Sequence, residues 1–265
     1  MNLADLSLDQ WRAFDPSTAR RTAREAADRV GGRLAAVETV EHLGAALHRA
    51  RIAWRGREFA LIPGGTVRLG FDLDRWEPTP GQAADYARSL AEGHGVSADL
   101  RSHLRTLLSP PRTARLDTVL MAVEDEPLTE VPADMPGVLA ARGLRMPSPD
   151  EWEHACGAGA RTLFRWGDEC PLDQVPYDAA EGPQHQPSAL GLRIAYDTYR
   201  AELSSDPTAV LGGDGGESVC EGYGFLLGWL PLATANRNPH MAEFVYGEEG
   251  EDLFEDFSVR PVLVL

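Results

Sequence analysis

The sequence predicts an α+β protein, with a helical N-terminal region over residues 1–55 followed by a loop-rich domain of helices and short strands over residues 56–265. Ala, Val and Leu recur at helical spacing in the first region. Residues 57–73 then change to short apolar runs broken by prolines and glycines. Pro, Gly and Asp become dense after residue 168, while Tyr, Leu and Val keep recurring, which indicates ordered irregular structure.

The N-terminal region is expected to contain two helices, because Gly31 and Gly32 interrupt the helical pattern. His42 and His48 are six residues apart and would face different sides of the second helix. They do not form the i, i+4 pair of a helical metal site. We therefore expect both to be solvated surface residues.

The next segment changes from strands to helices. Residues 59–62 and 66–69 flank a Pro-Gly-Gly turn, a pattern that predicts a β-hairpin. Residues 78–109 predict two helices, the second capped by Ser97 and stopped by the two prolines that follow it. Residues 116–123 alternate as in a strand, and residues 133–143 predict a short helix.

The clearest local pattern lies in residues 143–168. Ser148 can cap a helix, and Glu151 stands three residues later, as a capping box requires. Trp152, Ala155 and Cys156 would share one buried face of this helix. The FRWGD segment at its end predicts a short strand that finishes in a turn.

The same stretch carries a family resemblance. RMPSPDEWEHAC followed by FRWGD resembles the RLPTEAEWEYA…FPWGD signature of the formylglycine-generating enzyme / sulfatase-modifying factor family. FALIPGGTVRL before it, and AVLGGDGG and a terminus with Asn236, Arg237 and Arg260 after it, are similar to family segments in the family's order. The resemblance implies a C-type-lectin-like fold with little regular secondary structure. Residues 78–109 would then be a helical insertion, and Trp152, Trp166, Asn236 and Arg237 would border a pocket.

The resemblance also frames the expected chemistry. The family's oxidase activity uses a copper(I) site made by two cysteines after the GGSW-like turn, and soft thiolates suit that ion. This chain has one cysteine there, Cys220. A diverged pseudoenzyme is therefore expected, acting as a binding or scaffold module for a protein or a small-molecule ligand. The alternative is a copper-dependent or other metal-dependent oxidase in which Cys220 is catalytic and His240 or Cys170 is the second ligand.

Composition limits the partners. The formal charge is −16 and all 25 basic residues are arginine, which argues against nucleic acid and anionic membranes as partners. The lack of lysine excludes a Schiff base or a P-loop lysine. There is no membrane-length apolar run and no secretory pattern at the N-terminus, so a cytoplasmic protein with reduced cysteines is expected.

One acidic cluster could bind a cation. Its carboxylates are hard oxygen ligands at close spacing, which suits calcium. The cluster lacks the alternating Asp/Asn pattern of a calcium loop, and acidic runs are more often solvated loops. It consists of Glu248, Glu249, Glu251, Asp252, Glu255 and Asp256.

Overall fold

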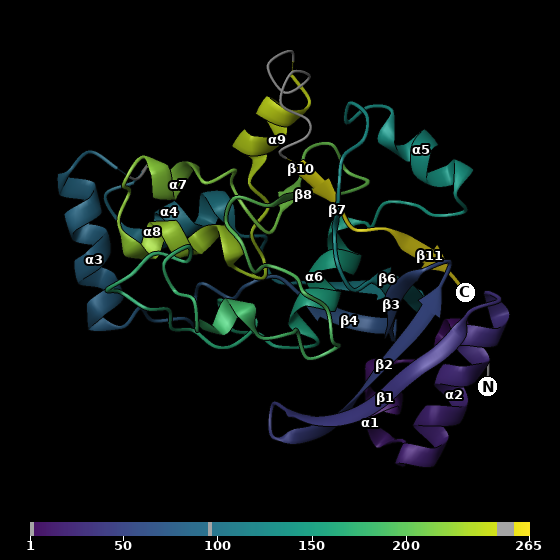
Figure 1. The fold of residues 1–265 in the computed structure, drawn as a ribbon. Coiled ribbons are helices and arrows are strands. Elements are labelled where there is room, and N and C mark those ends of the chain that lie inside the picture. The colour runs from purple at the N-terminus through teal and green to yellow at the C-terminus, as the bar shows by residue number, and fades with distance from the viewer. Residues whose placement is uncertain (1–2, 95–96, 248–256) are drawn as a thin grey trace.

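The computed structural model describes residues 3–94, 97–247 and 257–265, and it confirms the α+β class (Figure 1). The α-helices of the described residues are α1 (Leu8–Ala13), α2 (Pro16–Arg29), α3 (Pro80–Ala91), α4 (Leu100–Leu107), α5 (Met135–Ala141), α6 (Pro149–Gly157), α7 (Glu217–Cys220), α8 (Phe225–Trp229) and α9 (Pro239–Val245). The strands are β1 (Arg33–His42), β2 (Ala45–Trp54), β3 (Arg57–Ile62), β4 (Gly65–Leu69), β5 (Arg112–Leu116), β6 (Val119–Ala122), β7 (Glu126–Pro127), β8 (Ala201–Leu203), β9 (Val210–Leu211), β10 (Phe257–Val259) and β11 (Val262–Val264). Among these residues, no helix is both long enough and apolar enough to cross a bilayer.

The strands form two larger sheets and one two-stranded ladder. The larger sheets have the orders β1-β2-β3-β6-β11 and β7-β10-β8-β9, and β4 pairs with β5. All described pairs are antiparallel except β10 with β8. Since β10 and β11 are adjacent in the chain, the C-terminal segment joins the two larger sheets.

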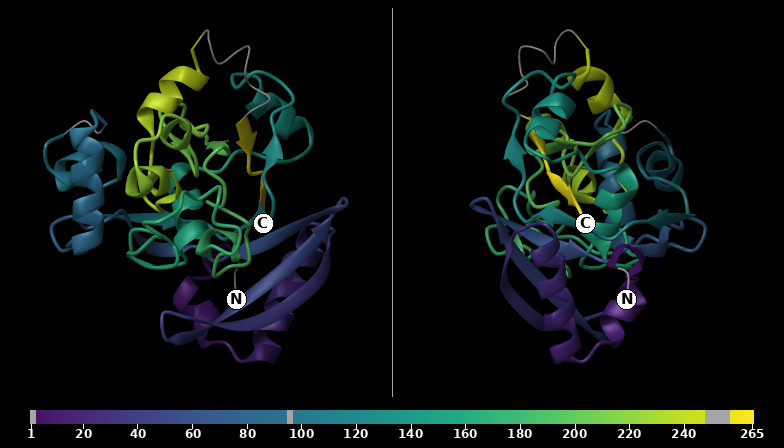
Figure 2. Two further views of the ribbon diagram at one scale, coloured as in Figure 1. Left: turned by 60° about the vertical axis from the view of Figure 1, so that its left-hand side comes forward. Right: turned by 90° about the vertical axis from the view of Figure 1, so that its right-hand side faces the viewer.

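The second half of the N-terminal region differs from the expected helix. Residues 33–54 form the β1–β2 hairpin, whose two-residue turn places Leu43 at φ 54° and Gly44 at φ 72°. Two positive φ angles in succession match the twist of a hairpin, but Leu43 gives no turn signal in the sequence. Only the first half is helical, with α2 ending before Gly31 as expected. Figure 2 shows α1, α2 and the hairpin as a layer at one end of the molecule.

This hairpin also corrects the expectation for His48. Its side chain is 2% exposed, between the hairpin and α1. One ring nitrogen lies 2.8 Å from the carbonyl of Phe14, and the other lies 3.0 Å from the hydroxyl of Thr39. His48 is therefore an interior residue whose ring joins the helical layer to the sheet. The domain boundary at residue 55 stays a prediction, although β2 and β3 are hydrogen-bonded across it.

The strands on either side of the Pro-Gly-Gly turn are confirmed, but they do not form a hairpin. β3 pairs with β2 and β6, whereas β4 pairs with β5. A Cβ on Gly64 would lie 2.3 Å from the carbonyl oxygen of Leu116. At this turn the chain therefore passes close to β5 and enters a different sheet. The residues of the turn alone do not predict this.

The middle of the chain largely follows expectation. α3, α4 and α5 fall within the expected segments, but α4 is capped by Asp99 instead of Ser97. The single strand expected at 116–123 is divided, because β5 and β6 belong to different sheets. From residue 158 to residue 200 the chain forms turns and one short 3-10 helix, which confirms a loop-rich segment.

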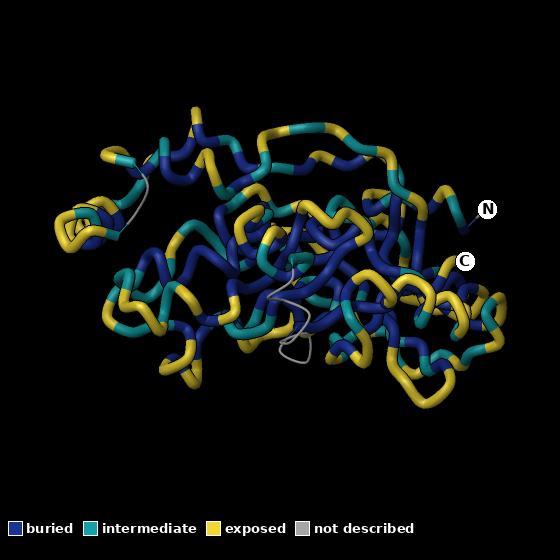
Figure 3. The backbone as a smooth tube through the Cα atoms, turned by 90° about the horizontal axis from the view of Figure 1, so that it is seen from above, coloured by how far each residue is buried: buried dark blue, intermediate teal, exposed yellow. Residues whose placement is uncertain are grey.

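α6 has the expected cap. The Ser148 hydroxyl accepts from the Glu151 amide over 3.2 Å, and the Ser148 amide donates to the Glu151 carboxylate over 2.8 Å. Trp152, Ala155 and Cys156 are buried, and Figure 3 shows how burial concentrates inside the fold. The segment after the helix forms a turn closed between Phe164 and Gly167, not the expected strand.

Candidate ligand-binding cleft

A cleft of about 820 Å³ lies between the α3–α4 segment and the C-terminal helices α7, α8 and α9. Figure 1 shows α3, α4, α7 and α8 gathered at the side of the molecule away from both termini. Leu227, Leu230 and Phe257 are buried side chains in its lining. Polar residues of several types also line it: His94, His103, Asp214, Glu217, Cys220, Tyr223 and His240.

Asp214 organises the α7 side of the cleft. Its buried carboxylate accepts hydrogen bonds from the Gly216 amide at 2.9 Å and from the Ser218 amide and hydroxyl at 3.0 and 2.6 Å. Burial raises the pKa of Asp214, and these hydrogen bonds oppose that shift. The carboxylate thus supports the backbone turn that begins α7.

Cys220 is the last residue of α7, and it is exposed. Its Sγ lies 3.3 Å from the hydroxyl of Tyr199, and this hydrogen bond raises the pKa of Tyr199 to about 12. Gly216, at φ 84°, makes the approach possible, since a Cβ there would lie 2.2 Å from the Tyr199 ring. The glycine-rich segment therefore positions a thiol at the cleft, with a tyrosine beside it.

The opposite wall comes from the α3–α4 segment. The His94 ring lies against the Tyr223 ring, with centroids 4.8 Å apart, and the Tyr223 hydroxyl donates to Glu217 over 3.1 Å. The Asp85 carboxylate on α3 accepts from the Leu226 amide of α8 over 2.7 Å. Both contacts join the helical segment to the C-terminal helices, so the two walls are held together.

Three of the residues singled out from the sequence are brought to this cleft. Cys220, His240 and Asn236 all line it. Asn236 is buried and donates through its side-chain amide to the Pro231 carbonyl over 3.1 Å. His240 is exposed at the start of α9. The cleft therefore combines a thiol and an imidazole with a buried amide.

The other residues expected to border a pocket lie elsewhere and contact the protein itself. Trp152 is fully buried in α6. Trp166 stacks on Phe164 with centroids 4.9 Å apart, and its indole N–H donates to the Glu169 carbonyl over 3.0 Å. The burial of Trp152 and the contacts of Trp166 within the protein give both tryptophans a structural role.

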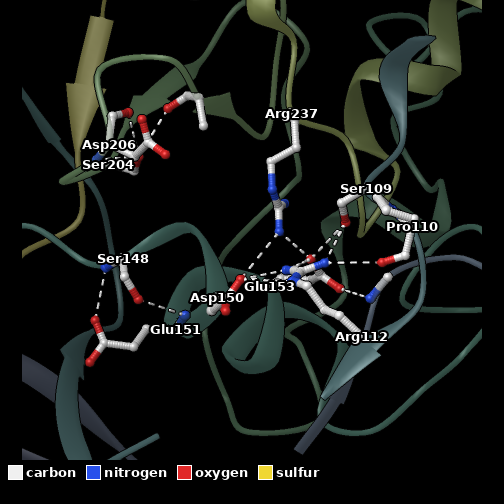
Figure 4. A network of polar contacts seen from close by, with 12 residues as sticks. Ser109, Pro110, Arg112, Ser148, Asp150, Glu151, Glu153, Ser204, Asp206 and Arg237 are labelled. Carbon is white, nitrogen blue, oxygen red and sulfur yellow. Dashed lines mark hydrogen bonds and ion pairs between the residues drawn. The ribbon is translucent and has the colours of Figure 1, made fainter. Parts of the chain in front are cut away.

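Arg237 belongs to a partly buried ion-pair network (Figure 4). Its guanidinium pairs with Glu153, which is 4% exposed and also accepts from Arg112 over 2.8 Å. Arg112 pairs in turn with Asp150 at 2.5 Å. The second oxygen of Glu153 accepts from the Gly70 amide. Four chain segments therefore meet at one carboxylate.

The candidate metal ligands lie in different parts of the structure. Cys170 does not line the cleft, and burial together with Asp85 and Glu169 raises its pKa to about 12. The structure therefore does not bring Cys170 to Cys220 at the cleft. The described residues contain no group of three or more His, Cys, Asp or Glu arranged to hold a metal. The acidic cluster at 248–256 lies outside the described residues.

Several cleft residues could not be identified as site residues from the sequence. His94 and His103 come from the segment treated as an insertion, and burial lowers the pKa of His103. Asp214 lies within the glycine-rich stretch, where Ser218 four residues later is a weak sign of a carboxylate-capped turn. Only the tertiary fold brings these residues to Cys220.

The comparisons with known proteins add no family. The sequence matches no protein-family model, and a search of curated proteins finds no match.

Proposed function

We propose that this protein is a binding module that holds a small organic ligand in the cleft between α3–α4 and α7–α9. The observation that carries the proposal is a cleft of about 820 Å³ where apolar side chains meet a few polar groups. Small-molecule sites typically occupy ~300–1,000 Å³ and combine an apolar lining with a few placed polar groups. The contacts between Asp85 and Leu226 and between His94 and Tyr223 join the two walls and support a cleft that is formed before ligand arrives.

We also propose that the protein is a diverged, non-catalytic relative of the formylglycine-generating enzymes, with a C-type-lectin-like fold. Support comes from the order of the similar sequence segments and from the capped α6 with its buried Trp152. The single cysteine of the cleft supports loss of the oxidase reaction. A cytoplasmic location belongs to the proposal, supported by three cysteines that form no disulfide.

Cys220 offers a direct test of ligand binding. It is exposed at the cleft, whereas burial raises the pKa of Cys156 to about 12, and Cys170 is similarly shifted by burial. One thiol per native chain should therefore react rapidly with iodoacetamide, and Cys220→Ser should abolish that rapid phase. A fragment that occupies the cleft should slow the alkylation. The test panel contains cationic, anionic and neutral aromatic fragments. The proposal fails if none of them slows the alkylation of Cys220 and none binds by calorimetry.

A pair of substitutions locates the binding. Leu107 is half-buried in the cleft lining, so Leu107→Trp should fill part of the cleft and weaken fragment binding by about tenfold. Leu172 is also half-buried but does not line the cleft, which makes Leu172→Trp the matched control. Equal affinities of the two variants would place the fragment somewhere else and contradict the proposed site.

A second candidate function rests on Cys220 and His240, which line the same cleft. A thiolate and an imidazole are both suitable copper(I) ligands, so the alternative is a copper-dependent oxidase of the sulfatase-modifying type. Copper(I) titration against a competing chelator tests it. Cys220→Ser and His240→Gln should each remove the site, while Cys170→Ser should keep it. Equal stoichiometry in the wild type and Cys220→Ser excludes this function.

A further inference from the structure

We propose that the cleft selects an organic cation, an ammonium group carried on an apolar or aromatic body. This inference rests on the proposed function and gives its ligand class. The first observation is a bias in charge. The chain contains 25 arginines and no lysine, yet no arginine of the described residues lines the cleft. The residues that are not described contain no arginine in the sequence.

The charged groups of the lining are acidic. Asp214 and Glu217 both line the cleft, and no arginine of the described residues offsets them there. The Asp214 carboxylate is buried and accepts hydrogen bonds from backbone amides at the start of α7. Glu217 is exposed, and its carboxylate accepts a hydrogen bond from the Tyr223 hydroxyl. Glu217 is thus a partly oriented carboxylate that a ligand can reach. A cleft lined by one sign of charge raises the local concentration of the opposite charge.

Aromatic rings supply the second part of the recognition. The Phe244 and Phe257 rings meet edge to face, with centroids 6.3 Å apart, and the His94 and Tyr223 rings lie 4.8 Å apart. Tyrosine and phenylalanine faces attract cations through their ring quadrupoles. A carboxylate or phosphate ligand would find no arginine and would meet Glu217. The lining therefore favours a cation over an anion of the same shape.

The test uses three probes that share one phenylethyl body and carry a cationic, a neutral or an anionic head group. They are phenethylammonium, 2-phenylethanol and 3-phenylpropionate, each titrated by calorimetry and by protection of Cys220 from alkylation. We expect the ammonium probe to bind about tenfold tighter than the carboxylate probe at low salt. The difference should narrow in 1 M salt, where the screening length is only ~3 Å.

A matched pair of variants tests the role of the carboxylate. Glu217→Gln should weaken ammonium binding about threefold, which is the scale of an exposed ion pair, and should leave the alcohol probe unaffected. Glu243→Gln is the control, because Glu243 is exposed on α9 but does not line the cleft. Equal affinity for all three probes, or tighter binding of the carboxylate, overturns the cation inference and leaves the binding module intact. Failure of all three probes and of the fragment panel overturns both.

Discussion

The indole N–H of Trp152 donates a hydrogen bond to a carboxylate oxygen of Glu202 over 2.8 Å, and both side chains are buried. The same carboxylate pairs with Arg260, whose guanidinium nitrogens lie 2.6 and 2.9 Å from its two oxygens. α6, β8 and the segment between β10 and β11 therefore meet at Glu202. The tryptophan of the sequence signature is held by a charged partner fifty residues away in the chain.

Glu202→Gln should destabilise the protein by about 3–5 kcal/mol, because the buried Arg260 would lose its hydrogen-bonded carboxylate and keep only the more distant Asp125, at 3.8 Å. Trp152→Phe should cost less, about 1–3 kcal/mol, since it removes the indole N–H that donates to one carboxylate oxygen of the buried Glu202. Urea unfolding at neutral pH measures both. The control is Glu38→Gln, which removes an exposed pair with Arg51 and should change stability by less than about 1 kcal/mol. A cost for Glu202→Gln no larger than the control's would contradict a structural role for the pair.

Glu153 should be the second large determinant of stability. It binds Arg112, Arg237 and the Gly70 amide while only 4% exposed. Glu153→Gln should therefore cost about 3–5 kcal/mol. The network neighbours the cleft, because the Arg237 amide donates to the carbonyl of Leu107 over 3.0 Å.

Asp150→Asn is the comparison within this network. Asp150 pairs with Arg112, but its side chain is 34% exposed, and we expect a loss of about 1 kcal/mol. The same urea titrations measure both variants. If Asp150→Asn proves as damaging as Glu153→Gln, burial is not what makes the Glu153 contacts important.

α6 could be predicted from the sequence because its determinants are local. Ser148 and Glu151 satisfy each other's backbone groups within one turn, and the apolar spacing specifies the buried face. The β1–β2 hairpin could not be predicted in the same way. Its alanines suit a helix, and the turn at Leu43 and Gly44 has only one residue that favours positive φ.

The cleft could not be predicted from local sequence patterns, for a different reason. Cys220, His240 and Asn236 could be singled out one at a time, and the structure brings them to one cleft. Their neighbours His94 and His103 come from residues more than a hundred positions earlier. Contacts at that separation depend on how the helices assemble, and no periodicity or capping signal records them.

Acid should weaken the cap of α6. Burial alone would raise the pKa of Glu151, but Arg145 and the Ser148 amide outweigh it and hold that pKa below its ordinary value of 4.5. The group therefore contributes stability above pH 4.5, and this contribution is lost as the pH falls through the depressed folded-state pKa. Glu151→Gln should cost about 1–2 kcal/mol at pH 7. The gap to the wild type should close at pH values below the folded-state pKa, as measured by urea unfolding at several pH values. A gap independent of pH would mean that the Arg145 pair contributes nothing.

His154 should give a different pH dependence, closer to neutrality. Its ring is 3% exposed in α6, and one nitrogen lies 2.8 Å from the Pro63 carbonyl oxygen, which can only accept. Burial lowers the pKa of His154 below the ordinary value of 6.5, so the folded protein keeps the ring neutral. Protons then bind preferentially to the unfolded chain below pH 6.5, and stability falls as the pH is lowered toward the folded-state pKa.

The measurement is the free energy of unfolding between pH 8 and pH 5.5 for wild type and His154→Gln. The variant should lose about 1–3 kcal/mol at pH 8 through altered packing and hydrogen bonding. As the pH is lowered, the free energy of unfolding of the variant should fall less steeply than that of the wild type. The two slopes should differ by up to ~1.4 kcal/mol per pH unit, which is the contribution of one titrating proton. Burial also lowers the pKa of His42 and His103, so part of the slope should remain. Glu38→Gln retains all the histidines and should reproduce the wild-type slope. If His154→Gln does so as well, the buried ring is not a source of the acid sensitivity.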